Sequence, residues 1–349
     1  MPIATPREPP VVRDAFVAWL EQRTGARVAV SSFDAPIGGG LSSETFLVTA
    51  MVAENPTRLV LRLPPHGDGL FPQYDLAMQA RVLEVLHETT SVPVPLVFAY
   101  EGDDEWLGAP FLVMHHAEGR VPTDQPSFLA TGWIHELAPA DQRTMQQSFL
   151  ATVAHIHRVD WAEIGLDDLA RPGTGSPLAR DLAWWATYLE WAADGADVTT
   201  TRRALAWCEA HTPASEPPPS LLWGDVRMPN VVFDDALLPA AVLDWEMAGI
   251  GPAEVDVGWW LAIHRLLVRV SGGDLPGFLP RDAALAWYEA HLGRPFDHEH
   301  LHWYETYGAL RSAAIMVRMG RLLHDLGILP DRSLQERNPC TDVLDELLA

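Results

Sequence analysis

The sequence predicts an α+β protein with two lobes of unequal size, a small strand-rich lobe over residues 1–117 and a larger, mainly helical lobe over residues 118–349. The length of 349 residues allows two packed units, at roughly 150 residues for each. In the first third of the chain apolar and polar residues alternate with the period of β-strands, and from about residue 125 the apolar residues recur at the spacing of helices. This change from strand-like to helix-like spacing of the apolar residues marks the boundary between the two lobes.

The smaller lobe should contain two amphipathic helices and five strands. Between Leu59 and Leu63 alternate leucines share one face of a strand and Arg62 lies on the other, so one face is core and the other carries a charge. The helices are expected over residues 11–24 and 73–88. The strands are expected over residues 27–33, 45–52 and 58–63 and in the runs VPVPLVFAY and FLVMHH.

The larger lobe should consist of long helices interrupted by short strands. The proline-rich run ASEPPPS, residues 214–220, breaks the helical pattern, and three short apolar pieces follow it, LLWGD, NVVFDD and AAVLDW. The helices are expected over residues 141–158, 178–192, 200–211, 253–270, 281–292 and 298–325.

Composition excludes several classes of function. All 24 basic residues are arginine, so the chain has no lysine for a Schiff base or for a phosphate-binding P-loop, and any phosphate must be held by arginine, backbone amides or metal. With 47 acidic residues the net charge is −23, which repels nucleic acid and anionic lipid. No nucleic-acid or membrane partner is therefore expected. The same charge suits a cationic substrate, and a general role in solubility explains it equally well.

Three observations predict a cytoplasmic protein. The two cysteines, Cys208 and Cys340, match no disulfide or metal-binding spacing. The first residues, MPIATPREPPVVRD, lack the apolar core of a signal peptide. No uncharged apolar stretch of about 18 residues is present, so a membrane span is not expected. The oligomeric state is left open.

The strongest functional signal is the segment LLWGDVRMPNVVF followed by AAVLDWE. Asp225 and Asn230 are five residues apart on a turn between apolar strands, and Asp244 ends the next strand. Phosphoryl transfer needs a carboxylate that orients and deprotonates the attacking hydroxyl, and hard oxygen ligands for Mg²⁺. The spacing Asp-x-x-x-x-Asn with a later strand-end Asp is that of a kinase catalytic loop and metal site. Alternatively, Asp225 and Asn230 only cap a tight hairpin.

A glycine-rich segment, IGGGLSSETF, lies between the first two expected strands. Gly38, Gly39 and Gly40 allow close approach to the backbone, and Ser42 and Ser43 can hold phosphate oxygens. Taken alone, a flexible hairpin tip explains this segment equally well. The order along the chain favours the functional interpretation, because a glycine loop, a strand with an outward basic residue, a helix, a hinge-like strand and the Asp/Asn/Asp set together predict a protein-kinase-like fold.

These segments resemble the aminoglycoside phosphotransferase and choline kinase family, and more closely the branch whose kinase domains occur with acyl-CoA dehydrogenases. The resemblance covers nearly the whole chain and rests on GGGLSSET, LVLRLPP, FLVMHHAEGR, IHRVD, and GDVRMPN through LDWEMAGIGPAEVDVGWWL. It implies that Asp225 is the catalytic base and that Asn230 and Asp244 bind Mg²⁺. By the same resemblance Arg62 replaces the strand lysine that grips the nucleotide phosphates, and Arg227 lies where protein kinases place a lysine near the transferred phosphate.

The resemblance also implies a nucleotide site, and in it the chain departs from the family pattern. Trp223 stands where the family has a histidine, and an indole can pack the loop without matching the imidazole hydrogen bonds. Gln79 stands where a glutamate usually pairs with the strand's basic residue, and Asp75, one helical turn earlier, could supply the missing carboxylate. Asp256 is expected to brace the catalytic loop. The expected nucleotide-binding residues are Gly39, Gly40, Ser42, Ser43, Arg62, Gln79, Met114 and His116, the last two at an adenine-binding hinge.

The predicted function is a Mg²⁺-dependent phosphotransferase that moves the γ-phosphate of ATP or GTP to a hydroxyl of a small molecule, either aminoglycoside-like or a hydroxyacyl metabolite. A protein substrate is disfavoured because fewer than ten residues separate Asp244 from the next expected helix, too few for a peptide-binding activation segment. The main alternative is a nucleotide-binding regulatory module without turnover, which the departures at Gln79 and Trp223 favour. A carboxylate-pair hydrolase would leave the glycine loop and Arg62 unexplained.

Overall fold

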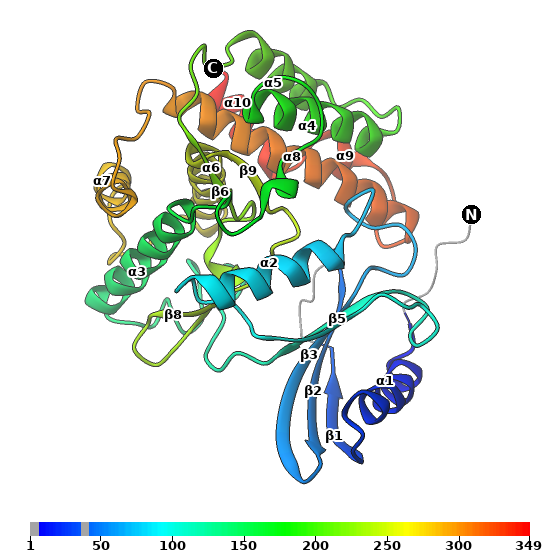
Figure 1. Cartoon of the computed structure of the whole chain (residues 1–349). Coiled ribbons are helices and arrows are strands. Elements are labelled where there is room, and N and C mark those ends of the chain that lie inside the picture. Colours follow the sequence, from blue (N-terminus) through cyan, green and yellow to red (C-terminus); the bar gives the residue numbers. More distant parts are fainter. Residues whose placement is uncertain (1–6, 36–41) are drawn as a thin grey trace. The chain divides into compact units, whose positions relative to one another are not determined.

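The computed structural model describes residues 7–35 and 42–349, and the chain divides into two compact units, Met1–Glu118 and Gly119–Ala349 (Figure 1). The first unit contains an antiparallel five-stranded sheet in the order β1-β2-β3-β5-β4. Its strands are β1 (Val28–Asp34), β2 (Glu44–Val52), β3 (Asn55–Leu63), β4 (Val97–Glu101) and β5 (Phe111–His115). Its helices are α1 (Pro9–Thr24) and α2 (Leu76–Thr89).

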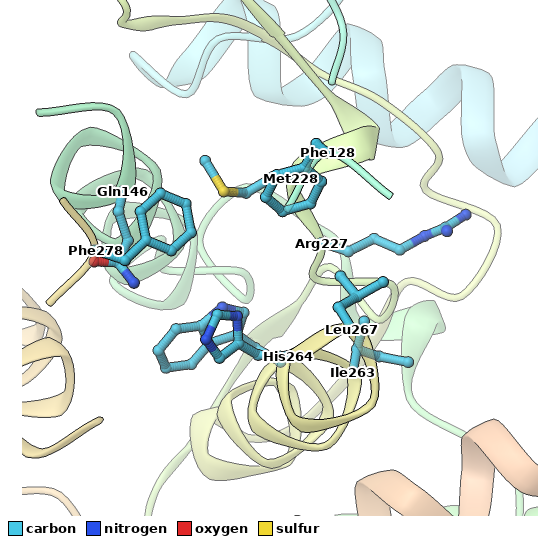
Figure 2. A pocket seen from close by; sticks show the side chains of 9 residues that line it. Phe128, Gln146, Arg227, Met228, Ile263, His264, Leu267 and Phe278 are labelled. Carbon is cyan, nitrogen blue, oxygen red and sulfur yellow. The ribbon is translucent and has the colours of Figure 1, made fainter. Parts of the chain in front are cut away.

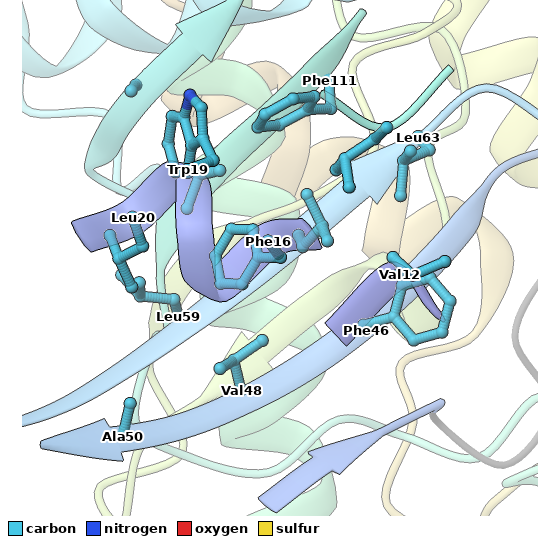
Figure 3. Packing of buried hydrophobic residues seen from close by; sticks show 14 of the residues in the cluster. Val12, Phe16, Trp19, Leu20, Phe46, Val48, Ala50, Leu59, Leu63 and Phe111 are labelled. Atoms are coloured by element: carbon cyan, nitrogen blue, oxygen red, sulfur yellow. The ribbon is translucent and has the colours of Figure 1, made fainter. Parts of the chain in front are cut away.

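The core of the first unit forms where α1 covers one face of this sheet. The alternation predicted for β3 is confirmed, because Leu59, Leu61 and Leu63 are at most 1% exposed. Phe16 and Trp19 of α1 are buried in the same apolar cluster (Figure 3). Since side chains on a strand alternate between faces, this packing turns Arg62 of β3 to the face of the sheet opposite the cluster.

The second unit is mainly helical. Gly258 of α6 (Ala253–Ser271) and Gly308 of α8 (Leu301–Asp325) lie against each other's helix backbone, with no room for a Cβ atom at either position, so two of its longest helices cross in close contact. The long helices are α3 (Pro139–His157), α4 (Pro177–Ala193), α5 (Thr199–Ala210), α6 (Ala253–Ser271), α7 (Arg281–Leu292) and α8 (Leu301–Asp325). Among the helices described, in either unit, none is long and apolar enough to span a bilayer.

Two short antiparallel sheets, each of two strands, interrupt the helices of the second unit. The three apolar pieces predicted after the proline-rich run become β6 (Pro219–Leu222), β7 (Val231–Phe233) and β8 (Pro239–Val242). β7 pairs with β8, and β6 pairs with a fourth strand, β9 (Gly249–Pro252), which the sequence analysis did not predict. The sequence GIGP has no strand pattern of its own, so β9 forms because β6 offers it a partner.

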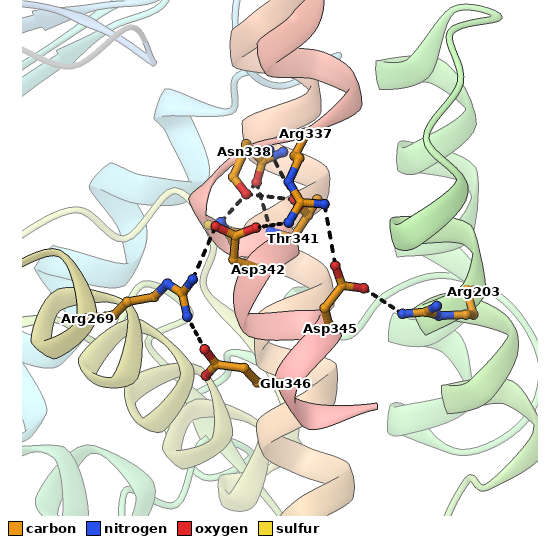
Figure 4. Close-up of polar contacts among 9 residues, drawn as sticks. Arg203, Arg269, Arg337, Asn338, Thr341, Asp342, Asp345 and Glu346 are labelled. Carbon is orange, nitrogen blue, oxygen red and sulfur yellow. Dashed lines mark hydrogen bonds and ion pairs between the residues drawn. The ribbon is translucent and has the colours of Figure 1, made fainter. Parts of the chain in front are cut away.

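The C-terminal segment adds two helices that were not predicted, α9 (Ser333–Glu336) and α10 (Pro339–Leu347). Asn338 and Thr341 form a capping box at the start of α10. Ion pairs then join α10 to its neighbours: Asp345 accepts from Arg203 of α5 at 2.6 Å, and Glu346 pairs with Arg269 of α6 (Figure 4). The predicted helix 298–325 also begins later, at Leu301, because Asp297 accepts the backbone N–H of His300 and holds a turn there.

Candidate active site

The segment between β6 and β7 forms a tight loop, which we call the catalytic loop (residues 223–230). Gly224 has φ +95°, and a Cβ atom there would clash with the backbone oxygen of Met247, so only glycine fits this position. Met228–Asn230 makes one turn of 3₁₀ helix that leads into β7. Asp225 therefore directly follows a turn that requires glycine at position 224.

Asp225 is held by three hydrogen-bond donors. Its Oδ2 accepts from Arg227 Nε at 2.9 Å and from Asn230 Nδ2 at 2.8 Å, and its Oδ1 accepts from Trp259 Nε1 of α6 at 3.0 Å. The side chain remains 14% exposed, so the carboxylate is both fixed in orientation and open to a ligand. The structure thus brings three predicted residues together and adds Trp259, which was not among the predicted site residues.

Asp256 of α6 braces the backbone of the catalytic loop, as predicted. It is fully buried, and its carboxylate accepts from the backbone N–H groups of Trp223 at 2.8 Å and Gly224 at 3.1 Å. The same carboxylate lies 3.1 Å from His157 Nε2 of α3. The buried carboxylate of Asp256 therefore links α6 to the catalytic loop and to α3.

His157 joins Asp256 to Tyr288. Its Nε2 donates to Asp256 Oδ2 at 3.1 Å, and its Nδ1 lies 2.7 Å from the hydroxyl oxygen of Tyr288. Burial, followed by the charges of Glu254 and Asp256, raises the pKa of Tyr288 well above its ordinary value. The Tyr288 hydroxyl therefore stays protonated.

Trp223 does more than pack the catalytic loop. It is fully buried, and its Nε1 donates to the backbone oxygens of Leu243 at 2.8 Å and Asp244 at 3.2 Å. The indole thus ties the catalytic loop to the segment that follows β8. The tryptophan makes polar contacts of its own in place of those of the family's histidine.

Asn230 and Asp244 lie at neighbouring ends of the β7–β8 hairpin. Val231 pairs with Val242, and Leu243 N donates to Asn230 O at 2.8 Å, so the residue after Leu243 adjoins Asn230. Asp244 has φ +58°, an uncommon left-handed conformation for a residue other than glycine. Asp244 is half-buried, and Asn230 is buried.

The donor set of this pair suits a hard cation. Asn230 donates its N–H₂ group to Asp225, which leaves the amide oxygen as an acceptor, and Asp244 supplies carboxylate oxygens. Within residues 7–35 and 42–349, no three His, Cys, Asp or Glu side chains form a metal-binding group. One amide and one carboxylate are a partial oxygen set of the kind Mg²⁺ uses, because Mg²⁺ retains waters and takes further oxygens from substrate phosphates.

Arg227 bridges two carboxylates. In addition to Asp225, it pairs with Asp124 through Nη1 at 2.7 Å. Burial disfavours its charge, but the two carboxylates outweigh burial and raise the pKa of Arg227 above its ordinary value. Asp124 was not predicted; two backbone hydrogen bonds between Arg120 and Phe233 anchor its segment beside β7.

In the first unit, two predicted phosphate-binding residues are neighbours. Arg62 Nη2 donates to Ser43 Oγ at 3.1 Å, and Ser42 beside it is 8% exposed. Gly39 and Gly40, predicted for the same loop, lie outside the described residues.

The two α2 residues considered as partners of Arg62 have different surroundings. Gln79 is 2% exposed, so its side chain belongs to the interior of the unit. Asp75 instead caps α2, since its Oδ1 accepts the backbone N–H of Met78 at 2.8 Å. The cap uses one oxygen of Asp75, and its pairing with Arg62 stays a prediction.

Met114 and His116 lie at the end of β5. Met114 is buried and pairs with Val60 of β3. The backbone N–H of His116 donates to Arg58 O at 3.0 Å. Burial, and then the nearby Arg58 charge, lower the pKa of His116, which keeps its ring neutral near pH 7.

A small pocket of about 10 Å³ adjoins the catalytic loop within the second unit (Figure 2). Arg227 and Met228 contribute from the catalytic loop, and most of the other side chains are apolar or aromatic. The remaining lining residues are Phe128, Gln146, Trp260, Ile263, His264, Leu267 and Phe278.

A strand-rich unit followed by a helical unit with an Asp-x-x-x-x-Asn loop defines a class of protein, the small-molecule phosphotransferases with a protein-kinase-like fold. The sequence model of the phosphotransferase enzyme family (APH) matches residues 35–311, and the chain belongs to this family. The family and the fold predicted from the sequence are thereby confirmed.

The curated relatives that the chain matches are much longer proteins. Probable acyl-CoA dehydrogenase IBR3 of Arabidopsis thaliana is 27% identical over 296 residues, which are 80% of this chain and 35% of that protein. Acyl-CoA dehydrogenase family member 10 of Mus musculus is 28% identical over 203 residues, 58% of this chain and 18% of that protein. The chain thus spans about a third or less of these relatives.

Solved structures share the fold over nearly the whole chain. An aminoglycoside phosphotransferase candidate from Ralstonia eutropha superposes with a TM-score of 0.73 at 23% identity, covering 96% of this chain and 97% of that one. Macrolide 2′-phosphotransferase MphH from Brachybacterium faecium gives a TM-score of 0.57 at 19% identity, covering 95% and 98%. At these identities the likeness establishes the fold alone.

Proposed function

We propose that the protein transfers the γ-phosphate of ATP or GTP to a hydroxyl group of a small molecule, with Asp225 as the base. The observation that carries this proposal is the Asp225 carboxylate, which three donors orient and which remains accessible. A base fixed in this way can accept the proton of the acceptor hydroxyl as its oxygen attacks the γ-phosphorus. The bond to the bridging oxygen then breaks, and the nucleoside diphosphate leaves.

Asn230 and Asp244 are the proposed Mg²⁺ ligands. The two residues lie at adjoining ends of the β7–β8 hairpin, and Trp223 donates to the backbone of Asp244. When bound, Mg²⁺ supplies positive charge that offsets the charge of the phosphate oxygens. Arg227 is proposed to hold an oxygen of the transferred phosphate, because its charge is secured by two carboxylates and lies two residues from the base.

The first unit is the proposed nucleotide-binding lobe, over residues 1–117, and residues 118–349 form the proposed catalytic and acceptor lobe. Arg62 would replace lysine as the phosphate-gripping side chain, with Ser43 at its guanidinium. Gly39, Gly40 and Ser42 are proposed to contact the same nucleotide phosphates. Gln79, Met114 and His116 are the remaining proposed contacts, the last two at the adenine.

The acceptor is proposed to be either an aminoglycoside-like compound or a hydroxyacyl metabolite. The names of the structural neighbours support the first class, and the acyl-CoA dehydrogenase relatives support the second. The dehydrogenase activity named for those relatives is not assigned to this chain, which spans a minority of their length. A regulatory module without turnover is less well supported, because Asp256 and Trp223 hold the catalytic loop by buried hydrogen bonds.

A direct test supplies radiolabelled ATP or GTP with Mg²⁺ and a panel of hydroxyl acceptors, including kanamycin and linear hydroxyalkanoates. The proposal predicts transfer of label to at least one acceptor by the wild-type protein and its loss in Asp225→Asn. If no acceptor becomes labelled, and if Asp225→Asn does not change the hydrolysis of either nucleotide, the result would support the regulatory module instead.

A further inference from the structure

We propose that Arg311 of α8 and Trp185 of α4 bind a carboxylate group of the acceptor, one side chain away from the base Asp225. This inference rests on the proposed function, because it takes Asp225 as the place where the acceptor hydroxyl reacts. Neither acceptor class proposed above is defined by a negative charge, so the site adds a requirement. It selects a hydroxylated anion against a polycationic amino sugar.

Arg311 is a buried cation without an anion. It is 3% exposed, and its Nε and Nη1 atoms are buried without a hydrogen-bond partner. Among the residues that the structure describes, no carboxylate forms an ion pair with Arg311, although the chain carries 47 acidic residues. Because an unpaired charge and unpaired donors in the interior are unfavourable, we expect this arginine to meet an anion when the protein works.

Three aromatic rings surround the guanidinium in place of a carboxylate. Its Cζ atom lies 5.1 Å from the ring centres of Trp185 and Trp259 and 5.8 Å from that of Tyr307. Cation–π contacts offset part of the cost of burying the charge, but they leave the guanidinium N–H groups without oxygen acceptors. The Tyr307 hydroxyl donates to Asp181 at 2.8 Å, so that carboxylate already has a partner.

Trp185 adds a further unpaired donor beside the guanidinium. Its Nε1 is buried without a partner, and the residue is 1% exposed. Every unpaired atom of Arg311 and Trp185 is thus a donor, so the matching group is one that only accepts, as a carboxylate does with both oxygens. A water molecule would bring two donors of its own, for which this pair of side chains offers no acceptor.

Trp259 connects the donor pair to the base. Its indole N–H donates to Asp225 Oδ1 at 3.0 Å, and its ring is one of the three around Arg311. A single side chain therefore separates the base from the cation, within the second unit. Since hydrogen bonds do not hold its Nε and Nη1 atoms, the Arg311 guanidinium can turn toward a carboxylate bound beside Asp225.

Calorimetric titration with matched ligands tests the site. The ligands are linear ω-hydroxyalkanoates of four to eight carbons, with the diol and the amino alcohol of each length, titrated with and without Mg²⁺ and a non-hydrolysable nucleotide. At the length that binds best, the hydroxy acid should bind about tenfold to a hundredfold more tightly than the diol, the range for a hydrogen bond between charged groups. The amino alcohol should bind most weakly. Equal affinities or no binding at every length, or tightest binding of the amino alcohol, would overturn the inference.

Variants assign the preference to Arg311. Arg311→Met keeps an apolar stem and removes the charge, so the preference for the hydroxy acid should disappear, and Trp185→Phe should reduce it severalfold by removing one donor. Arg318→Met is the matched control and should keep the preference, because Arg318 is also a buried arginine of α8 and lies 4.6 Å from the ring centre of Trp191. A preference that survives Arg311→Met in a folded protein would refute the assignment.

Thermal unfolding separates a ligand-binding role from a structural one. An unpaired buried charge destabilises the free protein, so Arg311→Met should unfold at the wild-type temperature or above it. The hydroxy acid should raise the unfolding temperature of the wild-type protein and not that of Arg311→Met. A lower unfolding temperature in Arg311→Met, together with an unchanged preference for the hydroxy acid, would show that Arg311 is structural.

The binding readout also separates this inference from the proposed function, since binding requires no turnover. If the hydroxy acid binds through Arg311 but no phosphate is transferred to any acceptor, the anion site stands and the proposed reaction fails. If phosphate is transferred at rates and affinities independent of the acceptor's charge, the reaction stands and the anion site fails.

Discussion

Replacement of Asp256 should destabilise the protein more than a typical substitution. Its buried carboxylate accepts from Trp223 N, Gly224 N and His157 Nε2, and Asp256→Ala would leave all three donors buried without an acceptor. Hydrogen bonds to a charged group contribute about 1.5–3 kcal/mol each. Because such contributions are not additive, we expect the free energy of unfolding to fall by about 4 kcal/mol.

The conservative variant should show a smaller loss. Asp256→Asn keeps one oxygen acceptor, but its amide N–H₂ would face a backbone donor, and we expect a loss of about 2 kcal/mol. Unfolding in urea, followed by tryptophan fluorescence, measures both values. Asp282→Asn is the control, because Asp282 is an exposed acidic residue in the first turn of α7 and should change stability by less than about 1 kcal/mol. A loss below about 1 kcal/mol in Asp256→Ala would refute the reasoning.

Three further variants test the proposed roles of single side chains. Asp244→Ala should abolish the part of nucleotide-induced thermal stabilisation that requires Mg²⁺, and a full Mg²⁺-dependent shift in that variant would remove Asp244 from the metal site. Arg62→Lys should weaken binding of a non-hydrolysable nucleotide, because lysine lacks the planar fork of guanidinium, and Arg62→Ala should weaken it further; wild-type affinity in the alanine variant would contradict the assignment. Asp124→Asn should lower turnover about threefold to tenfold by releasing Arg227, while Glu136→Gln on the same segment should not. If Asp124 acts through Arg227, its effect should disappear in an Arg227→Gln background; a persistent effect would mean a separate role.

Local patterns predicted the parts of the fold whose cause is local. The buried leucines of β3 follow from strict alternation, and the long helices follow from their apolar periodicity. β9 and α10 were missed because both depend on partners distant in sequence. β9 pairs with β6, and α10 is held by arginines of α5 and α6.

The same distinction applies to the candidate site. The spacing of Asp225 and Asn230 is a property of one loop, so it can be recognised in the sequence. Trp259 and Asp124 approach that loop from 34 and 103 residues away in the chain, and neither has a local signal that separates it from a core aromatic or a surface acid. Only the packing of α6 and of the segment after residue 119 shows these two contacts.

The most direct test of the account compares phosphoryl transfer by the wild-type protein and Asp225→Asn. With radiolabelled nucleotide and an acceptor that the wild-type protein uses, turnover should fall by a factor on the order of 10² to 10⁴, because the variant lacks the base. Binding of the Mg²⁺ nucleotide should remain nearly intact, since Asn230 and Asp244 are unchanged. Unchanged turnover in a folded Asp225→Asn protein would contradict the central claim that Asp225 accepts the acceptor's proton.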